Sequence, residues 1–168
     1  MQVISKKAAI VLDRVDTKIL ALLQADATVP LAEIAEKVNL SQTPCWRRIQ
    51  KLERAGYIKK RVAILDREKL NVGTTVFIAI RTNQHTSDWL EKFHRVVASM
   101  PEVVDFHRLS GNIDYLIRVI VPGIREYDEF YKRLISKIDI TDVSSMFSME
   151  EIKSSSEVPL AYARLDET

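Results

Sequence analysis

The chain has 168 residues, of which 46% are hydrophobic and 29% charged, and its formal net charge is +2. This composition excludes a disordered or fibrous chain, and the length suits one large domain or two small ones. Cys45 is the only cysteine, so an intrachain disulfide is excluded and a reducing, cytosolic compartment is expected. The apolar run within residues 1–13 is too short for a signal peptide or a membrane span, so we expect a leading arm and no membrane partner.

Positive charge is concentrated in one segment. Residues 41–61 contain seven Lys and Arg side chains against Glu53 alone, which leaves 18 basic and 22 acidic residues in the rest of the chain. Solvated helix surfaces usually mix both signs, so a patch of one sign on a nearly neutral protein indicates a polyanionic partner such as nucleic acid.

Three helices are predicted in the first third of the chain. Their apolar stripes are Val15, Ile19, Leu22 and Leu23; Leu31, Ile34, Ala35 and Val38; and Cys45, Ile49 and Leu52. Pro30 suits the first turn of the second helix, Asn39 suits the left-handed conformation of a tight turn, and Ser41 suits the N-cap of the third helix. The short connection through Asn39 and Leu40 therefore predicts a helix-turn-helix.

The third helix presents a polar, basic side opposite its apolar stripe. Arg47 and Gln50 suit base edges in the major groove, whereas Lys51 and Arg54 suit phosphates. We interpret Trp46, which flanks the stripe, as a rim residue that packs on the neighbouring helix, with contact to a base as the alternative. The predicted DNA-contacting residues are Ser41, Gln42, Thr43, Arg47, Arg48, Gln50, Lys51, Arg54, Lys59, Lys60 and Arg61.

Gly56 is a predicted helix C-cap, and residues 57–65 after it predict a short strand pair, or wing. Three of the basic residues above, Lys59, Lys60 and Arg61, lie in this wing and would contact the DNA backbone. The polar residues 66–73 that follow predict a linker.

The second half of the chain follows the order strand, helix, strand, strand, helix, strand. Apolar periodicity predicts strands at 74–82, 103–109, 113–121 and 142–153, and helices at 89–100 and 127–138. This order predicts a ferredoxin-like βαββαβ domain with an antiparallel sheet and both helices on one side of it, so the fold class is α+β. Residues 154–168 show no clear period and predict a loose C-terminal tail.

The segments LDRVDTKILALLQADA, LAEIAEKVNLSQTPCWRRIQKLERAGYI and PEVVDFHRLSGNIDYLIRV resemble the Lrp/AsnC (leucine-responsive and asparagine-responsive) family of bacterial and archaeal transcription regulators. The resemblance covers about residues 12–153. It implies a winged helix-turn-helix domain at 1–65, a linker at 66–73 and an ACT-like domain for effector binding and oligomerisation at 74–153. It also implies homodimers formed through the sheets, often assembled as octamers, and an amino-acid effector bound between dimers.

The resemblance also implies the residues of the effector site, which are Ser110, Gly111, Asn112, Asp114, Tyr115, Thr141, Asp142 and Ser144. Asp114 suits the ammonium group of an amino acid, and the backbone N–H groups of the glycine-containing loop suit its carboxylate. The same loop also fits a plain hairpin turn, in which the Asp114 carboxylate only accepts a hydrogen bond from the turn. The segments TPCW and YDEFYKRL resemble most a branch that includes a regulator of cysteine detoxification, which implies a sulfur amino acid as effector.

No motif indicates an enzyme. His85, His94 and His107 have no metal-ligand spacing, and Cys45 on a buried stripe is interpreted as a small core residue, although a redox-sensing role stays open. We therefore predict no catalytic residue, no metal and no cofactor besides the amino-acid effector.

Two functions agree with these features. The first is an effector-responsive regulator that binds a two-fold symmetric site in double-stranded DNA, located in the cytoplasm on the nucleoid. The second is an architectural nucleoid protein that wraps DNA with little sequence specificity. Arg47 and Gln50 favour the first function, because their side chains suit base edges.

Overall fold

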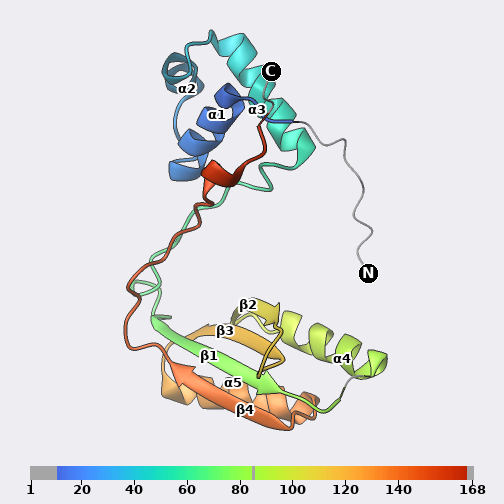
Figure 1. Ribbon diagram of the computed structural model, residues 1–168. Helices are drawn as coiled ribbons and strands as arrows, with labels where there is room; N and C mark the ends of the chain where they lie inside the picture. The colour runs from blue at the N-terminus through green and yellow to red at the C-terminus, as the bar shows by residue number, and fades with distance from the viewer. Residues whose placement is uncertain (1–10, 85, 166–168) are drawn as a thin grey trace. The chain divides into compact units, whose positions relative to one another are not determined.

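The computed structural model describes residues 11–84 and 86–165, and the chain folds as two units (Figure 1). Of the described residues, the helix unit contains 11–63 and 153–165, and the sheet unit contains 64–84 and 86–152. Each unit buries a hydrophobic core of its own. None of the described helices is long and apolar enough to cross a membrane.

The helix unit contains the three predicted helices, α1 (Arg14–Ala25), α2 (Leu31–Lys37) and α3 (Gln42–Ala55). Helix α1 begins with a capping box, in which Asp13 accepts from the N–H of Asp16 and Asp16 accepts from the N–H of Asp13. The predicted apolar stripes supply the core, whose most deeply buried members are Ile19, Ile34, Ala35, Cys45 and Leu52.

The connection between α2 and α3 is the predicted tight turn. Asn39 has a left-handed backbone with φ 56°, and the N–H of Leu40 donates to the carbonyl of Ala35 at 2.9 Å. Gly56 ends α3 in the left-handed conformation, with φ 85°. The helix-turn-helix and both of its predicted boundary residues are therefore confirmed.

The strand pair predicted at residues 57–65 does not form. The segment is extended without strand pairing, and Val62 and Ile64 are 61% and 81% exposed. It contains no turn-forming residue after Gly56 that would fold it back on itself, and it continues directly into the sheet unit.

The C-terminal tail docks on the helix unit, where the sequence predicted a loose extension. Gln24 on α1 makes two hydrogen bonds with the backbone of Val158, accepting from its N–H at 3.1 Å and donating to its carbonyl at 3.3 Å. Leu160 and Ala163 pack against the helix core, and Leu165 forms a parallel β-bridge with Leu12. The helix unit is therefore built from both ends of the chain.

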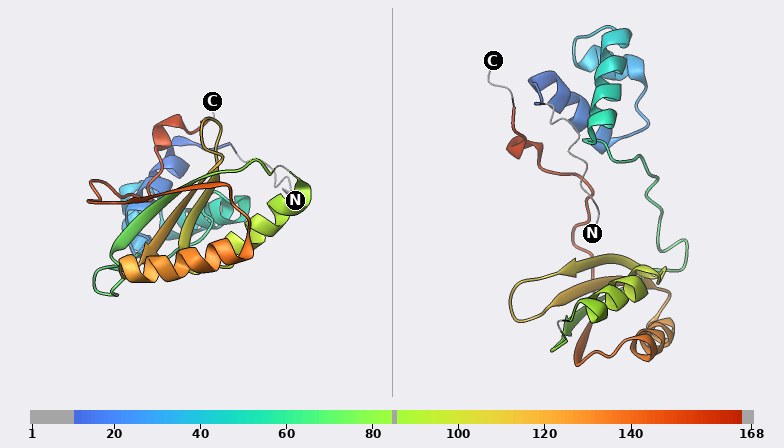
Figure 2. Two further views of the ribbon diagram at one scale, coloured as in Figure 1. Left: turned by 90° about the horizontal axis from the view of Figure 1, so that it is seen from below. Right: turned by 90° about the vertical axis from the view of Figure 1, so that its right-hand side faces the viewer.

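The sheet unit contains β1 (Thr74–Arg81), α4 (Ser87–Ala98), β2 (Val103–Arg108), β3 (Tyr115–Val121), α5 (Ile124–Lys137) and β4 (Asp142–Phe147). The strand order is β2-β3-β1-β4, and every neighbouring pair is antiparallel. Both helices lie on the same side of the sheet (Figure 2). This arrangement confirms the predicted ferredoxin-like fold.

Alternation along the strands separates the two sides of the sheet. On β3, Tyr115, Ile117 and Val119 are buried towards the helices, and Leu116 and Arg118 on the other side are partly exposed. The Trp89 indole N–H donates to the carbonyl of Asp139 at 3.0 Å, which ties α4 to the segment after α5. One side of the sheet is thus a filled core, and the other side is open.

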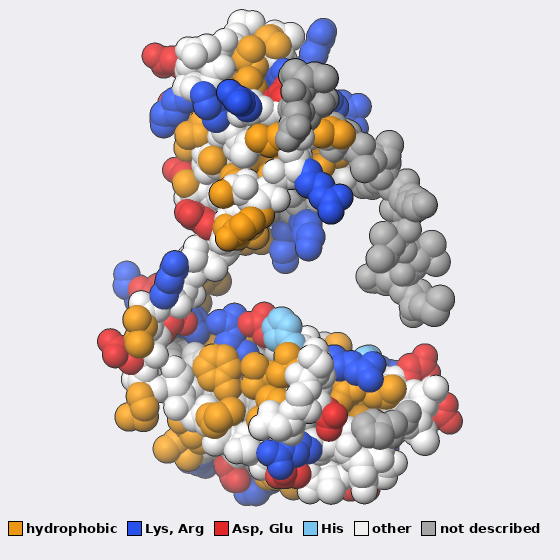
Figure 3. All heavy atoms as spheres, viewed as in Figure 1, with side chains coloured by type: hydrophobic (Ala, Val, Ile, Leu, Met, Phe, Trp, Pro, Cys, Tyr) orange, Lys and Arg blue, Asp and Glu red, His pale blue; other side chains and the backbone are white. Residues whose placement is uncertain are grey.

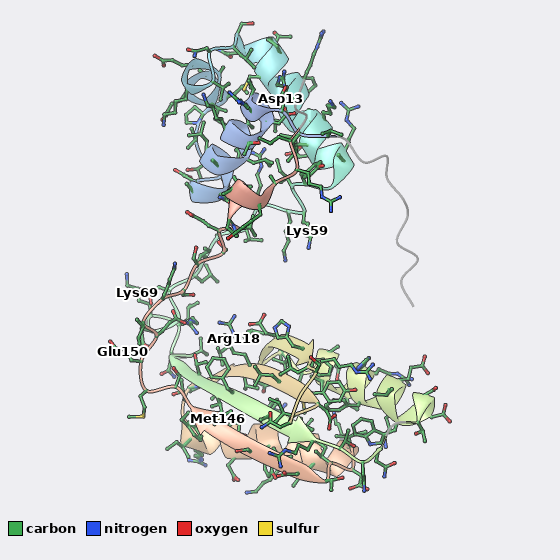
Figure 4. All side chains as sticks on the ribbon, in the orientation of Figure 1. Asp13, Lys59, Lys69, Arg118, Met146 and Glu150 are labelled. Atoms are coloured by element: carbon green, nitrogen blue, oxygen red, sulfur yellow. The ribbon has the colours of Figure 1, made fainter. Side chains whose placement is uncertain are left out.

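Strand β4 ends at Phe147, whereas the sequence predicted a strand over 142–153. Beyond it the chain leaves the sheet and runs beside the linker, where Lys69 and Glu150 are labelled in Figure 4. Arg67 of the linker pairs with Glu151 at 2.5 Å and donates to the Thr75 hydroxyl at 3.0 Å. These contacts place residues 66–73 within the sheet unit.

We expect Leu160→Ala to destabilise the helix unit by about 1 kcal/mol, because Leu160 is partly buried against its core. The matched control is Tyr162→Ala on the same short turn, since Tyr162 is 86% exposed and its loss should cost less than about 0.5 kcal/mol. Urea unfolding and hydrogen exchange of the α1 amides would measure both effects. Equal stabilities for the two variants would show that the tail does not support the unit.

Candidate DNA-binding and effector sites

Helix α3 separates a buried side from an exposed side. Cys45, Ile49 and Leu52 are at most 5% exposed and hold the helix on the unit's core. Burial raises the pKa of the Cys45 thiol, with Arg48 opposing the shift, so the thiol stays protonated at neutral pH. A protonated, buried thiol is a core residue and disfavours the redox-sensing alternative.

Two parallel rows of side chains cover the exposed side of α3, because residues four apart on a helix are neighbours. One row is uncharged and contains Gln42, Trp46 and Gln50. The other contains Thr43, Arg47 and Lys51, all exposed. The combination of an uncharged row and a cationic row is suited to a groove lined by base edges and flanked by phosphates.

Some predicted DNA-contacting side chains are already engaged within the unit. Gln50 donates to the Glu53 carboxylate at 2.9 Å, and Arg61 pairs with the other oxygen of Glu53 at 2.9 Å. The guanidinium of Arg54 donates to the backbone carbonyl of Gln50 at 3.2 Å. The remaining predicted residues, Ser41, Gln42, Thr43, Arg47, Lys51, Lys59 and Lys60, are exposed.

Arg48 is the predicted DNA-contacting residue that the structure places elsewhere. Its guanidinium pairs with Asp13 at 2.6 Å and with Asp16 at 2.7 Å, so it joins α3 to the start of α1. The hydrogen bond to Asp16 raises the pKa of Arg48. Burial raises the pKa of the Asp13 carboxyl, but the Asp16 N–H and Arg48 lower it more, and its pKa lies below the ordinary value.

The predicted effector residues come from two segments that meet the end of β1. The N–H of Asp114 donates to the carbonyl of Ile80 at 2.9 Å, and its carboxylate accepts from the N–H of Thr82 at 2.8 Å. On the other side of β1, Thr141 donates to the Asn83 side chain at 3.0 Å. Because β1 lies between β3 and β4, the fold brings both segments to one edge of the sheet.

The loop before β3 has the geometry of a hairpin turn. The N–H of Leu109 donates to the carbonyl of Asp114 at 2.8 Å, and Gly111 has φ 133°. Ser110, Gly111 and Asn112 are exposed. The carboxylate of Asp114 therefore has a structural partner at Thr82, and its sequence-based role as an ammonium acceptor would be additional to that bond.

Three other predicted effector residues have different surroundings. Tyr115 is 2% exposed and packs edge-on against Phe93, so it belongs to the core and not to a surface site. Asp142 lies 3.5 Å from the guanidinium of Arg81, and Ser144 is exposed on β4.

A cavity of about 400 Å³ lies at the opposite end of β1 from the predicted effector residues. Its lining includes Arg67 and four carboxylates, which belong to Asp66, Glu68, Glu150 and Glu151. Since Arg67 is already paired with Glu151, the cavity is poorly suited to the carboxylate of a free amino acid.

The open side of the sheet is apolar around one ion pair. Phe77, Leu116, Ile120 and Met146 alternate with residues that face the helices, and hydrophobic side chains gather over the strands in Figure 3. Arg118 pairs with Asp105 at 2.6 Å on this side. Asp105 on β2 pairs with Arg118, and Asp114 before β3 accepts from the N–H of Thr82. These two carboxylates on neighbouring segments therefore have separate partners and do not form the paired carboxylates that an acid–base catalyst would use.

No group of three or more His, Cys, Asp or Glu side chains is placed to hold a metal ion in the part of the chain that the structure describes. His94 lies beside Phe106 on the surface of the core, and His107 is exposed. His85 lies outside the described residues.

Comparison with known proteins matches both units to families. Residues 12–59 match a winged helix-turn-helix DNA-binding model, and residues 75–158 match the Lrp/AsnC ligand binding domain. The chain is 52% identical over 149 residues to the glutamate uptake regulatory protein of Zymomonas mobilis, a match that covers 89% of this chain and 91% of that protein.

Two solved structures are similar in both sequence and fold. An AsnC family transcriptional regulator from Agrobacterium tumefaciens is 57% identical with a TM-score of 0.88, over 90% of this chain and 99% of that one. A transcriptional regulator from Neisseria meningitidis, solved as an L-Met complex, is 34% identical with a TM-score of 0.86, over 90% and 98% of the two chains.

We expect Arg48→Ala to destabilise the helix unit by about 2 kcal/mol, because it leaves the buried carboxylate of Asp16 without its cationic partner. This value is below the range of about 3–5 kcal/mol for a fully buried ion pair, since the Arg48 side chain is one-third exposed. Arg47→Ala is the control and should change the free energy of unfolding by less than about 0.5 kcal/mol. Urea unfolding compares the two variants, and an Arg48→Ala protein as stable as the wild type would contradict the structural role.

Proposed function

The chain belongs to the Lrp/AsnC family of DNA-binding transcriptional regulators, and from this premise we propose that α3 reads a specific operator while an amino acid bound to the sheet unit controls assembly and DNA binding. The observation that carries the proposal is the exposed side of α3, where an uncharged row lies beside a cationic row. In the cell this activity would take place in the cytoplasm, on the nucleoid.

The roles of the α3 side chains follow from their chemistry. Arg47 is exposed and can donate two parallel hydrogen bonds to guanine. Gln50 donates one amide hydrogen to Glu53, and its amide oxygen and second amide hydrogen can pair with adenine. Lys51, Arg54, Lys59 and Lys60 would neutralise phosphates and so set the salt dependence of binding. An architectural protein would need only the phosphate contacts.

The proposed effector site lies at the edge of the sheet where β1 ends. Asp114 would accept from the ammonium group, and the exposed loop at Ser110, Gly111 and Asn112 would donate backbone N–H groups to the carboxylate. Thr141, Asp142 and Ser144 on the other side of β1 would contact the amino-acid side chain. The names of two relatives, one a glutamate uptake regulator and one an L-Met complex, support an amino acid as the effector class.

A homodimer is proposed through the open side of the sheet. This surface carries Phe77, Leu116, Ile120 and Met146, which a second copy would bury, and within the described residues no helix covers it. Figure 4 shows Arg118 and Met146 on this sheet. Further assembly of dimers into octamers would place the exposed loops of the effector site against a neighbouring dimer.

Such an assembly gives the effector a way to act at a distance. A ligand shifts an equilibrium only if it binds one state more tightly than the other. A site completed by a neighbouring dimer meets this condition, because the ligand gains contacts only in the assembled state. The spacing of the α3 helices on the operator would change with the assembly.

We expect Arg47→Ala to lose about 1–3 kcal/mol of discrimination between the operator and variants at one base pair. Lys51→Ala is the comparison, and it should weaken binding uniformly and reduce the salt slope by about one. Fluorescence anisotropy with DNA selected from a random library would measure both. Uniform losses for both variants, with no sequence preference in the wild type, would favour the architectural alternative.

We expect Asp114→Asn to weaken effector binding by about 10- to 100-fold, the range for loss of a charge-assisted hydrogen bond. An asparagine oxygen can still accept from Thr82, so the loop should keep its structure. A thermal-shift screen of the twenty amino acids identifies the effector, and calorimetry measures its affinity. Arg47→Ala serves as the control with unchanged effector binding, and an Asp114→Asn protein with wild-type affinity would move the ammonium site elsewhere.

We expect Met146→Glu to dissociate the proposed dimer, because it would bury a carboxylate in an apolar interface. Ile135→Glu on α5 is a matched control, since Ile135 and Met146 are 45% and 46% exposed in the single chain. Light scattering reads the mass of each variant. A Met146→Glu protein with the mass of the wild type would show that this surface is not the interface.

A further inference from the structure

Trp46 lies on the exposed side of α3, at the centre of the uncharged row. Its indole is 51% exposed, and it is not part of the core of the helix unit. Among the residues that the structure describes, the Trp46 side chain takes part in no hydrogen bond and no aromatic ring contact. The indole is therefore half-exposed, and its packing on a neighbouring helix stays a prediction.

The second tryptophan shows how this chain accommodates an indole that serves the fold. Trp89 is 9% exposed, stacks on Phe93 with ring centroids 4.9 Å apart, and donates its N–H to Asp139. Trp46 has none of these contacts. Its position at the centre of the exposed side of α3 leaves this large amphipathic ring available to whatever covers that side.

We propose that Trp46 packs against the 5-methyl group of a thymine in the major groove and selects an A·T pair at that position. The inference rests on the proposed role of α3 as the recognition helix. Thymine presents the one apolar group in the major groove, and the other edges of the base pairs are hydrogen-bond donors or acceptors. The apolar face of an indole ring matches this methyl group, and the indole N–H is left to donate to an acceptor beside it.

The neighbours of Trp46 support this assignment. Gln42 and Gln50 lie one turn before and one turn after it in the same row, and neither carries a charge. Gln50 suits adenine, so Gln50 and Trp46 would each contact an A·T pair. Arg47 and Lys51, in the next row, supply the cations for phosphates or guanine.

The test removes the methyl group from the DNA. Binding sites are first selected from a random double-stranded library with the wild-type protein, and each thymine is then replaced in turn by uracil, which lacks only that methyl. The burial of one methyl group corresponds to about a fourfold change in affinity. We expect one thymine in each half-site to show this loss with wild-type protein and none with Trp46→Ala. Arg47→Ala should keep the fourfold ratio, although its overall affinity falls.

Fluorescence provides a second readout that does not depend on a truncated side chain. The emission of the wild type should change when selected DNA is added, and that of Trp46→Phe should not, because Trp89 is buried away from the surface. The difference between the two proteins isolates the signal of Trp46.

The possible failures are distinct. If no sequence is enriched and all DNA binds equally, site-specific binding itself is wrong. If a site is enriched but tolerates uracil at every thymine, or if Trp46→Ala retains the uracil penalty, the thymine contact is overturned. An unchanged wild-type emission on selected DNA also overturns it.

Discussion

The position of α3 depends on the ion pairs that Arg48 makes with Asp13 and Asp16. The two aspartates form the capping box of α1, so the same carboxylates start one helix and hold another. Asp16 is 2% exposed, and a buried carboxylate requires a cation in contact with it. These ion pairs and the buried stripe of α3 together set the direction in which the exposed rows of α3 face.

One helix therefore combines three kinds of contact. Its apolar stripe packs on the core of the helix unit, its Arg48 forms ion pairs with α1 and its cap, and its remaining cations are exposed to solvent. The pairing of Arg48 with two aspartates also affects the electrostatic surface, because its charge is offset within the unit by those carboxylates. The basic surface offered to a polyanion is the row of Arg47 and Lys51 with its extension into Arg54, Lys59 and Lys60.

Strand β1 has a comparable role in the sheet unit. It is the strand between β3 and β4, and its end receives the backbone N–H of Asp114 on one side and lies beside Thr141 on the other. Its residue Phe77 belongs to the open side of the sheet, opposite the core that α4 and α5 fill. The proposed ligand at the end of β1 and the proposed second copy on the open side would thus both contact one strand.

Much of the fold could be predicted from the sequence, because it depends on local periodicity. The three helices, the left-handed Asn39 and Gly56, and the alternation along β3 all follow from residue type and spacing. The Arg48 ion pairs could not be predicted, since their partners lie more than 30 residues away and nothing in the spacing links them. The docking of the tail was missed because it uses backbone hydrogen bonds to Gln24 and only a few apolar side chains, which leave no period. The bond from Thr82 to Asp114 likewise depends on the packing of neighbouring strands.

The return of the tail to the helix unit has a consequence for how the protein is made. Residues 12–63 leave the ribosome before the whole sheet unit, whereas the segment around Val158 and Leu160 follows that unit. The helix unit is therefore completed only after the sheet unit has been translated. A chain that stalls during synthesis of the sheet would present α3 without the support of the tail, so its helix unit would open more often and be cleaved more readily by proteases.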